Sequence, residues 1–493
     1  MRVAVYTLFL LWSNMIFGQS LNAVSHSNTC GIYATLVNPA SAAGGIDKLN
    51  VNLAGFGVTA HNNVLRSDLR FSMMELASFK APRRDQSEFR SPYVTSPRRR
   101  IWRPNLFVNL DAVQFAARFS ISKKWSVFSF IRERTFGNLS NLDYNAISFL
   151  SQNDEPYPDK DLTLKLDGSF LSYQEIGFGS AFEIYDKREH YWKIGGKYKK
   201  LNGRAIYALN MPQFKSSILE NGFRIQSKVN IIETSLKFLT QDPKEVILRP
   251  DIGRGNAFDI GIVYEHRPRS KKSTFRKNNP RLKSSQFNAR DLLKYDYRVS
   301  LSVLDIGGLS FNSSAVTQTT YTLDVEQTVE DYLESEYTSI FELLEDSINK
   351  QQERQHFRVS LPSTLNLMYD QSLEKGYFIS LQYVQRLSRK NQMSTYIPSH
   401  VLVQLRKEAK RCTFGLPILL MPATRTYILG ANLKAGPFFI GTNNISTILF
   451  RKFYNPSFYA GIQFSLRYKQ DPTIENYRSF RTKRKKVYPW SPM

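Results

Sequence analysis

The chain has 493 residues, with 67 Lys and Arg against 42 Asp and Glu, and a formal net charge of +25 at neutral pH. Apolar residues make up 42% of the sequence, charged residues 22%, and the mean hydropathy is −0.36. These values exclude a helical-bundle membrane protein and a disordered chain, and two cysteines in this length exclude a disulfide-rich scaffold or a cysteine-rich metal site.

The first residues are typical of an export signal. Arg2 carries one positive charge and precedes the apolar residues 3–12, which residues 13–18 follow. We therefore expect a signal peptide over residues 1–18, with an uncleaved anchor as the alternative. No later run reaches the roughly 18 apolar residues that a membrane helix needs. A soluble secreted β-rich protein and an outer-membrane β-barrel are the classes that fit.

The next part of the chain, residues 19–48, shows no strand pattern. It contains Asn38, Pro39 and Ala40, followed by small residues up to Gly45 that can turn and pack closely. We therefore expect a separate N-terminal segment ahead of the strands.

From residue 49 to residue 468, apolar and polar side chains alternate with period two. Over residues 357–371, for example, Val359, Leu361 and Leu367 face one way, and Asn366 and Asp370 face the other. Such stretches exceed the usual ~5–6 residues of a strand and reach the about 9–11 residues that cross a membrane. Candidate strands lie near residues 49–60, 105–121, 125–137, 169–185, 191–205, 221–238, 256–266, 295–309, 356–371, 376–390, 399–408, 411–421, 425–434, 436–443 and 456–468.

The number of candidate strands is odd, whereas a single-chain barrel usually closes with an even number. Either one candidate is wrong or two segments form one bent strand. We therefore predict an all-β fold, a transmembrane antiparallel β-barrel of about 14 strands (range about 12–16) over residues 49–468.

Short and long connections alternate between these strands, as the periplasmic turns and outer loops of such barrels do. The short ones lie at residues 122–124, 186–190 and 373–376, and the long ones at 61–104, 139–168, 267–294 and 310–355.

Two of the long connections carry opposite charges. Residues 267–294 are basic, whereas residues 310–355 include an acidic stretch, 320–352, that we expect to be a helical insertion. The two insertions either pair electrostatically or form separate solvated loops. One missed strand would move every later loop to the other side of the membrane. The pattern therefore does not show on which side either insertion lies.

Charged side chains fall on the face that would line the barrel. Lys193, Lys197 and Lys199 share one face of a strand, and Glu175 and Glu183 share the inward face of the strand before it. Rows on neighbouring strands come within cross-strand reach. The rows either form a salt-bridged lumen that supports a plug or act as a charge filter or headgroup site for an anionic amphiphile, with Lys197 and Lys199 as first contacts.

The C-terminal tail, residues 469–493, is polar and basic. It is either a solvated extension or a docking peptide for a periplasmic partner, whose contact residues would be Arg481, Lys483, Arg484, Lys485, Lys486 and Trp490. In an exported chain the basic charge favours anionic lipid, lipopolysaccharide or an acidic protein as partner, rather than nucleic acid.

Motifs for catalysis and metal binding are absent from the sequence. The six histidines form neither HxH nor HExxH, and no G-x-S-x-G nucleophile motif occurs. Cys30 and Cys412 either form one disulfide or remain free thiols. We predict a non-enzymatic protein without a metal or cofactor.

Several short motifs in order carry a family resemblance. They are Phe17 to Ser20, Asn38 to Ala40, Gly253 to Gly261, Ser302 to Gly307, Leu361 to Asn366 and Gly436 to Asn444. The chain resembles uncharacterised Bacteroidota outer-membrane β-barrels, which are similar in layout to long-chain fatty-acid transporters and to barrel subunits of the type IX secretion system.

The resemblance implies a barrel of about 14 strands with an N-terminal segment, including Asn38, Pro39 and Ala40, plugging the lumen. By analogy of layout it favours a plugged transporter for hydrophobic or amphipathic solutes. The alternative is a structural, partner-binding subunit of an envelope machine, for type IX secretion or outer-membrane protein assembly. The resemblance does not reach the basic tail or the acidic insertion.

Overall fold

The computed structural model describes residues 22–45, 47–62, 67–68, 105–122, 124–141, 162–187, 189–219, 221–234, 252–267, 295–328, 330, 347–354, 356–373, 376–388, 394–409, 412–422, 426–450, 452–453 and 455–467. The expected signal peptide, most of the basic insertion and the tail with its expected contact residues lie outside these ranges. Within them, no helix is long and apolar enough to cross a bilayer.

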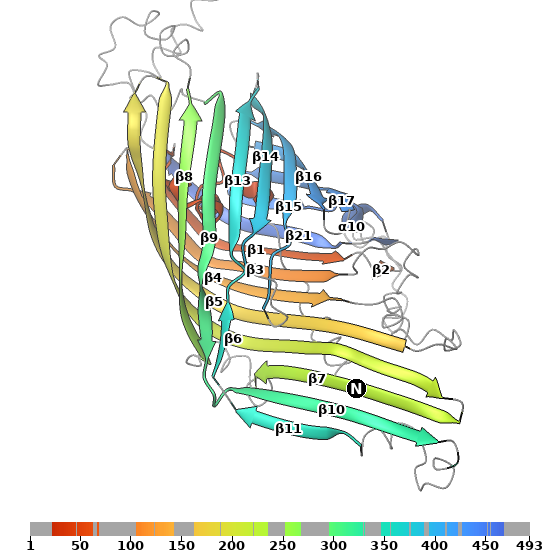
Figure 1. Ribbon diagram of the computed structural model, residues 1–493. Helices are drawn as coiled ribbons and strands as arrows, with labels where there is room; N and C mark the ends of the chain where they lie inside the picture. The colour runs from red at the N-terminus through yellow and green to blue at the C-terminus, as the bar shows by residue number, and fades with distance from the viewer. Residues whose placement is uncertain are drawn as a thin grey trace, which may run out of the picture.

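Antiparallel strands close into a barrel, because the first strand of the wall pairs with the last (Figure 1). β1 (Asp47–Asn62) pairs with β3 (Leu106–Ser120) on one side and with β21 (Ser457–Arg467) on the other. The wall continues from β3 through β4 (Trp125–Ser140), β5 (Leu162–Lys187), β6 (His190–Leu219), β8 (Gly253–His266), β9 (Tyr297–Phe311), β12 (Phe357–Ser360) with β13 (Thr364–Ser372), β14 (Tyr377–Arg386), β15 (His400–Glu408), β16 (Cys412–Met421), β17 (Thr426–Leu429) with β18 (Ala431–Ala435), and β19 (Phe438–Thr442).

The closed wall has 14 strands, which confirms the predicted number. β12 and β13 count as one strand because both pair with β9, and β17 and β18 count as one because both pair with β16. The extra candidate at residues 221–238 is a real strand, β7 (Gly222–Thr234), but it lies outside the wall.

β7 belongs to a side sheet that projects from one end of the barrel, at the lower right of Figure 1. It pairs with the far part of β6 and with β10 (Val316–Thr328), and β10 pairs with β11 (Asn349–Arg354). We call these three strands, with residues 162–172 of β5 and 205–219 of β6, the side sheet.

The helical interpretation of residues 320–352 is wrong at both ends, which are the strands β10 and β11. Pairing with β7 explains the difference. The acidic side chains of Asp324 and Glu326 stay exposed and face Arg224 of β7, with Arg224 Nη1 3.2 Å from Glu326 Oε2. Pairing with a neighbouring strand therefore outweighs the acidic composition that suggested a helix. Residues 331–346, in the middle of the predicted helix, lie outside the described part of the chain.

The topology also places the two charged insertions. The short turns and both ends of the wall lie at one end of the barrel, which we call the short-turn end. Residues 268–294 connect β8 to β9 at this end, whereas the excursion through β10 and β11 leaves β9 at the opposite end. The anchor points of the two insertions are therefore separated by the length of β9.

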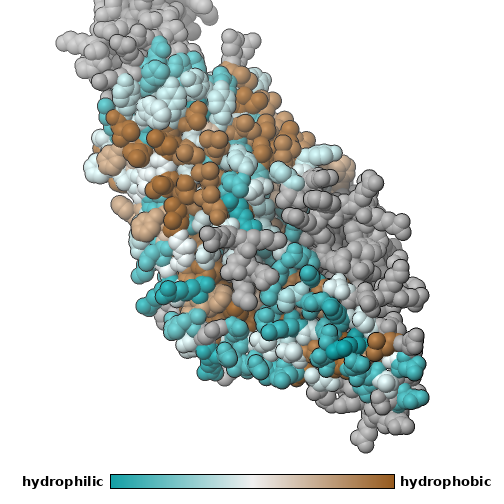
Figure 2. Space-filling view, viewed as in Figure 1, coloured by the Kyte–Doolittle hydropathy of each residue, from teal (hydrophilic) through white to brown (hydrophobic). Residues whose placement is uncertain are grey.

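The two faces of the wall differ as the alternation predicts. On β14, Ile379 and Leu381 are more than 40% exposed, whereas Phe378, Ser380 and Gln382 are fully buried. Figure 2 shows apolar side chains gathered over the barrel wall and polar ones over the side sheet. An apolar outer band and a polar interior are the pattern of a barrel in lipid.

Aromatic side chains mark the short-turn end on the outside. They form a chain of ring contacts, with centroids 4.9–6.3 Å apart, through Trp192, Tyr264, Tyr297 and Tyr369. Such a row is typical of the boundary between lipid and water.

The prediction of one continuous alternation over residues 357–371 is wrong. Val359 and Leu361 are buried inside the barrel, as are Asn366 and Asp370, so the inward face changes phase between them. The cause is a break at residues 361–363, where Pro362 has no N–H to donate to the ladder.

Candidate functional site

Residues 22–45, which we call the lumen segment, lie inside the barrel. They form α2 (Asn22–Ser25), α3 (Tyr33–Val37) and the 3-10 turn η1 (Pro39–Ala42). Ile32, Tyr33 and Ala40 are fully buried. The segment contacts strands all round the wall: Tyr33 with Asn52 of β1 at 2.6 Å, Ala42 O with Arg118 of β3 at 2.7 Å, Val37 O with Ser302 of β9 at 2.7 Å, His26 with Gln382 of β14 at 2.8 Å, Thr29 with Thr413 of β16 at 3.2 Å, and Thr29 O with Lys434 of β18.

The predicted plug residues Asn38, Pro39 and Ala40 lie against the wall where it has no side chains. Gly195 of β6 and Gly261 of β8 are cross-strand partners. A Cβ at Gly195 would lie 2.6 Å from Ala40 N, and one at Gly261 would lie 2.2 Å from Asn38 Oδ1. Asn38 Nδ2 donates to the Ile262 and Leu301 carbonyls, both at 3.2 Å. This glycine window lets the segment pack directly on the backbone of the wall.

The predicted lysine row points inward and is buried. Lys197 Nζ donates to Thr35 O and Leu36 O, both at 3.1 Å, which are carbonyls at the end of α3. It also lies 2.8 Å from a carboxylate oxygen of Asp259. Lys193 pairs with Glu265 at 2.6 Å, and Lys199 pairs with Asp259 at 2.8 Å and with Asp305.

The two predicted glutamates occupy different surroundings. Glu175 is fully buried and pairs with Arg134 at 3.0 Å, whereas Glu183 is half-buried and lies opposite Lys193 in the β5–β6 ladder. The main partners of the lysines therefore come from β8 and β9 rather than from the predicted glutamates.

The charges midway along the barrel balance one another. We call eight of these side chains the charged belt: Arg132, Arg134, Lys197 and Lys199 against Asp111, Glu175, Asp259 and Asp305. Buried charges are tolerated when each is paired and hydrogen-bonded. Asp305 reaches Arg134 at 2.9 Å from a left-handed backbone, with φ of +61°, which aspartate tolerates better than most residues.

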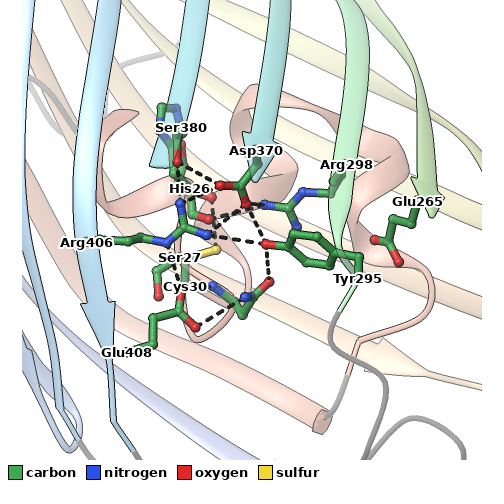
Figure 3. Close-up of polar contacts among 12 residues, drawn as sticks. His26, Ser27, Cys30, Glu265, Tyr295, Arg298, Asp370, Ser380, Arg406 and Glu408 are labelled. Carbon is green, nitrogen blue, oxygen red and sulfur yellow. Dashed lines mark hydrogen bonds and ion pairs between the residues drawn. The ribbon is translucent and has the colours of Figure 1, made fainter. Parts of the chain in front are cut away.

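A second ion cluster holds the start of the lumen segment (Figure 3). Arg406 lies between Asp370 at 2.7 Å and Glu408 at 2.8 Å, and Arg298 pairs with Asp370 at 3.0 Å. All four side chains are buried or nearly so. We call these residues the arginine cluster.

The arginine cluster bonds to the lumen segment directly. Glu408 accepts hydrogen bonds from the backbone N and from Nδ2 of Asn28, at 3.0 and 3.2 Å, and Arg298 donates to His26 O at 3.2 Å. Burial, followed by the positive charge of Arg406, lowers the pKa of His26 to about 4. His26 is therefore neutral at pH 7, and its Nε2 donates to Gln382.

The two cysteines do not pair. Cys30 is buried in the lumen segment, where its Sγ donates to Ser25 O at 3.1 Å, and Cys412 is exposed. Burial raises the pKa of the Cys30 thiol. Among the described residues, no group of three or more His, Cys, Asp or Glu side chains is placed to hold a metal ion.

A cavity of about 70 Å³, which we call the chamber, lies between the lumen segment and the end of the barrel opposite the short-turn end. Tyr33, Leu36 and Val37 form its floor, residues of the charged belt line one side, and Val384, Leu419 and Met421 line the other.

Residues 394–399, the cap segment, cover the chamber and contribute Ile397 and Pro398 to its lining. Two hydrogen bonds of 3.0 Å join the backbone of Tyr396 to the side chain of Asn138.

Sequence reasoning missed most of the lumen chemistry. Asp259, Asp305, Asp370 and Arg406 are single charges on strands, and each falls on the inward face. The two-residue alternation could have located these charges, since it assigns Asp370 to the same face of the strand as Asn366. Partners could not be assigned, because pairing depends on register and on the irregularity between Phe258 and Ile260.

Residues 39–443 match the model of a protein family described as "Family of unknown function (DUF5723)". The chain belongs to this family. The matched range runs from Pro39 of the lumen segment to Asn443 beside the chamber, so DUF5723 includes the charged belt, the arginine cluster and most of the wall. Comparison with curated protein sequences finds no match to this chain.

Solved structures similar to this DUF5723 chain are β-barrels of low identity. A TodX mutant described as a monoaromatic hydrocarbon channel has 8% identity and a TM-score of 0.44, and the match covers 92% of this chain and 100% of that one. A Pseudomonas aeruginosa FadL homologue has 7% identity, coverage of 92% and 99%, and a TM-score of 0.31. The Pseudomonas putida toluene transporter TodX has 9% identity, coverage of 87% and 92%, and a TM-score of 0.31.

Proposed function

We propose that this protein is a plugged barrel of the bacterial outer membrane that passes hydrophobic or amphipathic solutes. The apolar outer band and the aromatic row support a location in lipid. The ends of the wall and the short turns share one end of the barrel, which in our orientation faces the periplasm, so the side sheet and the cap segment face outward.

The observation that carries the proposal is how the lumen is closed. Hydrogen bonds and packing hold the lumen segment, and no strand of the closed wall includes it. The segment can therefore leave without opening the wall. A solute would pass the cap segment, occupy the chamber and leave beside a displaced lumen segment.

The balanced belt supports the first of the two interpretations of the lysine row. Lys197 and Lys199 already face Asp259 and Asp305, and Lys197 holds the end of α3. In our proposal these side chains support the plug, and they do not serve as free anion contacts.

Planar-bilayer conductance and uptake into whole cells test the proposal. The full protein should conduct little, and a variant lacking residues 22–45 should form a wide, stable conductance. In cells whose outer membrane excludes the fluorescent aromatic probe N-phenyl-1-naphthylamine, expression of the full protein should raise uptake of the probe. Equal uptake with and without protein would contradict transport, and low conductance of the folded deletion variant would contradict the plug.

The side sheet favours a second candidate function, that of a partner-binding subunit of an envelope machine for type IX secretion or outer-membrane protein assembly. The sheet lies outside the wall, and β11 is exposed at all six residues. The tail, residues 469–493, is the other proposed contact. Pull-down from gently solubilised outer membranes, comparing the full chain with one ending at Tyr468, tests this alternative. A partner recovered only with the full chain would favour it.

A further inference from the structure

Three buried polar groups on residues that line the chamber have no hydrogen-bond partner. One is Arg134 Nε, whose guanidinium already pairs with Glu175 and Asp305. The other two are His61 Nδ1 and Asn443 Oδ1, on residues that are 8% and 1% exposed. Leaving such a group unpaired in a buried place is unfavourable, so each needs an explanation. A polar group on a bound molecule would provide one.

The two residues lie close together on the wall. Asn443 N donates to Ser457 Oγ at 3.3 Å, and Ser457 Oγ lies 3.1 Å from Thr59 Oγ1. Thr59 is two residues before His61 on β1, and alternate residues of a strand share a face. One small molecule can therefore approach both groups.

We infer that the chamber binds a small neutral molecule with an apolar body and one hydroxyl group, such as a phenol or an alcohol. This inference rests on the proposed function and names its class of solute. Asn443 Oδ1 only accepts, so the ligand must donate, and His61 Nδ1 donates or accepts according to its tautomer. A hydroxyl group does both.

The body of the ligand would lie on apolar side chains. Phe107 stacks on the His61 ring, with centroids 6.3 Å apart and planes within 5°. Ile397, Leu419 and Met421 also line the chamber. An aromatic ring or a short alkyl chain suits these surfaces better than a sugar or a peptide does.

The charged belt disfavours an anion in the same place. Arg132 donates to Asp111 at 2.6 Å, and Arg134 lies 2.9 Å from Asp305 and 3.0 Å from Glu175. Across the described residues of the lining, no arginine or lysine lacks a carboxylate partner. A carboxylate ligand would be buried without a cation of its own and would carry no hydrogen for Asn443 Oδ1.

The size of the chamber limits the ligand and requires movement. About 70 Å³ is less than the roughly 150 Å³ of an apolar cavity known to hold one benzene ring. A one-ring ligand must therefore push the cap segment outward, against the two bonds between Tyr396 and Asn138.

Calorimetric titration of the folded barrel in detergent tests the inference with three matched probes. They are 4-methylphenol, p-xylene, in which a methyl group replaces the hydroxyl, and 4-methylbenzoate, which is anionic. We expect 4-methylphenol to bind about tenfold more tightly than either other probe. H61L and N443L should each weaken 4-methylphenol about tenfold, the equivalent of one hydrogen bond, and leave p-xylene unchanged.

N109L is the matched control, because the amide of Asn109 is also buried and unpartnered but does not line the chamber. It should leave the affinity for 4-methylphenol unchanged, and circular dichroism checks that each variant is folded. Equal affinities for the three probes, tighter binding of 4-methylbenzoate, or a loss in N109L as large as in N443L would overturn the inference.

The two proposals fail separately. If none of the three probes binds but N-phenyl-1-naphthylamine is still taken up, this site is wrong and transport stands. If 4-methylphenol binds as expected but the uptake assay gives no signal, the binding site stands and transport is wrong.

Discussion

The lumen segment is attached to the wall in two different ways at its two ends. At its start, charged side chains of the arginine cluster bond to His26 and Asn28. Near its end, Asn38 to Ala40 lie on the glycine window, where the wall leaves room for the backbone. The first attachment depends on charge and therefore on pH. The second depends mainly on shape, and Lys197 and Arg118 donate to backbone carbonyls on either side of it. Agents that act on charge should release the segment from its start.

One residue reports release of the segment in all four predictions below. Cys30 is buried in the lumen segment and Cys412 is exposed, so the ratio of their labelling by a maleimide measures how often the segment opens. Cys412 corrects for the effects of pH and reagent on the labelling chemistry.

The largest effect is expected from R406L, which removes the central cation of the arginine cluster. Asp370 and Glu408 would then be buried with too little positive charge, at a cost of about 3–5 kcal/mol. We expect a lower urea midpoint and rapid labelling of Cys30. R224A, which breaks an exposed pair with Glu326 on the side sheet, is the control and should cost less than about 1 kcal/mol. Equal midpoints for the two variants would contradict a structural role for the cluster.

Acid should act on the same attachment. The pKa of His26 is about 4 in the folded protein, against 6.5 for an exposed histidine. Because the folded value is the lower one, the stability that His26 contributes is complete above pH 6.5. It is lost as the pH falls from 6.5 toward 4, to a maximum of about 3 kcal/mol. The ratio of Cys30 to Cys412 labelling should rise over this interval, and in H26Q it should be flatter. An identical pH profile in H26Q would assign the effect to other groups.

The second attachment should respond to volume and not to acid. In G195A the new Cβ would meet the backbone at Pro39 and Ala40, at 2.6 Å, and overpacking of this kind costs about 1–3 kcal/mol. G196A places the same methyl group on the next residue, where the nearest atom is 3.8 Å away. We expect faster Cys30 labelling in G195A alone, with a difference between the variants that does not change with pH. Similar labelling of both variants would argue against the glycine window.

The smallest effect is expected from S302A. Ser302 Oγ donates to Val37 O at 2.7 Å, and one neutral hydrogen bond contributes about 1 kcal/mol. Cys30 labelling should rise by less than in G195A. A larger rise would mean that polar bonds, and not shape, dominate the second attachment.

Periodicity of side chains predicted the wall well, because a strand repeats every two residues whatever its partner is. It assigned Lys193, Lys197, Lys199 and Glu175 to the face that the structure places inside. It failed where the backbone departs from a regular strand. The break at Pro362 reverses the phase of Val359 relative to Asn366, which no periodic pattern can represent.

The strand number and the charge partners depended on long-range pairing. Residues 221–238 have the composition of a strand, and only the pairing of β7 with β10 places them outside the wall. Likewise, Asp305 reaches Arg134 and Lys199 from a left-handed backbone, and local composition does not predict that conformation.

The length of β6 has a consequence for work on living cells. Its 30 residues extend for about 100 Å at 3.3 Å per residue, several times what a tilted strand needs to cross a bilayer. In the proposed orientation, the paired residues Leu219 and Gly222 stand far from the lipid, at the distal edge of the side sheet. An epitope tag inserted there would be accessible to antibodies on intact cells. Surface staining would therefore show whether the side sheet faces outward from the membrane.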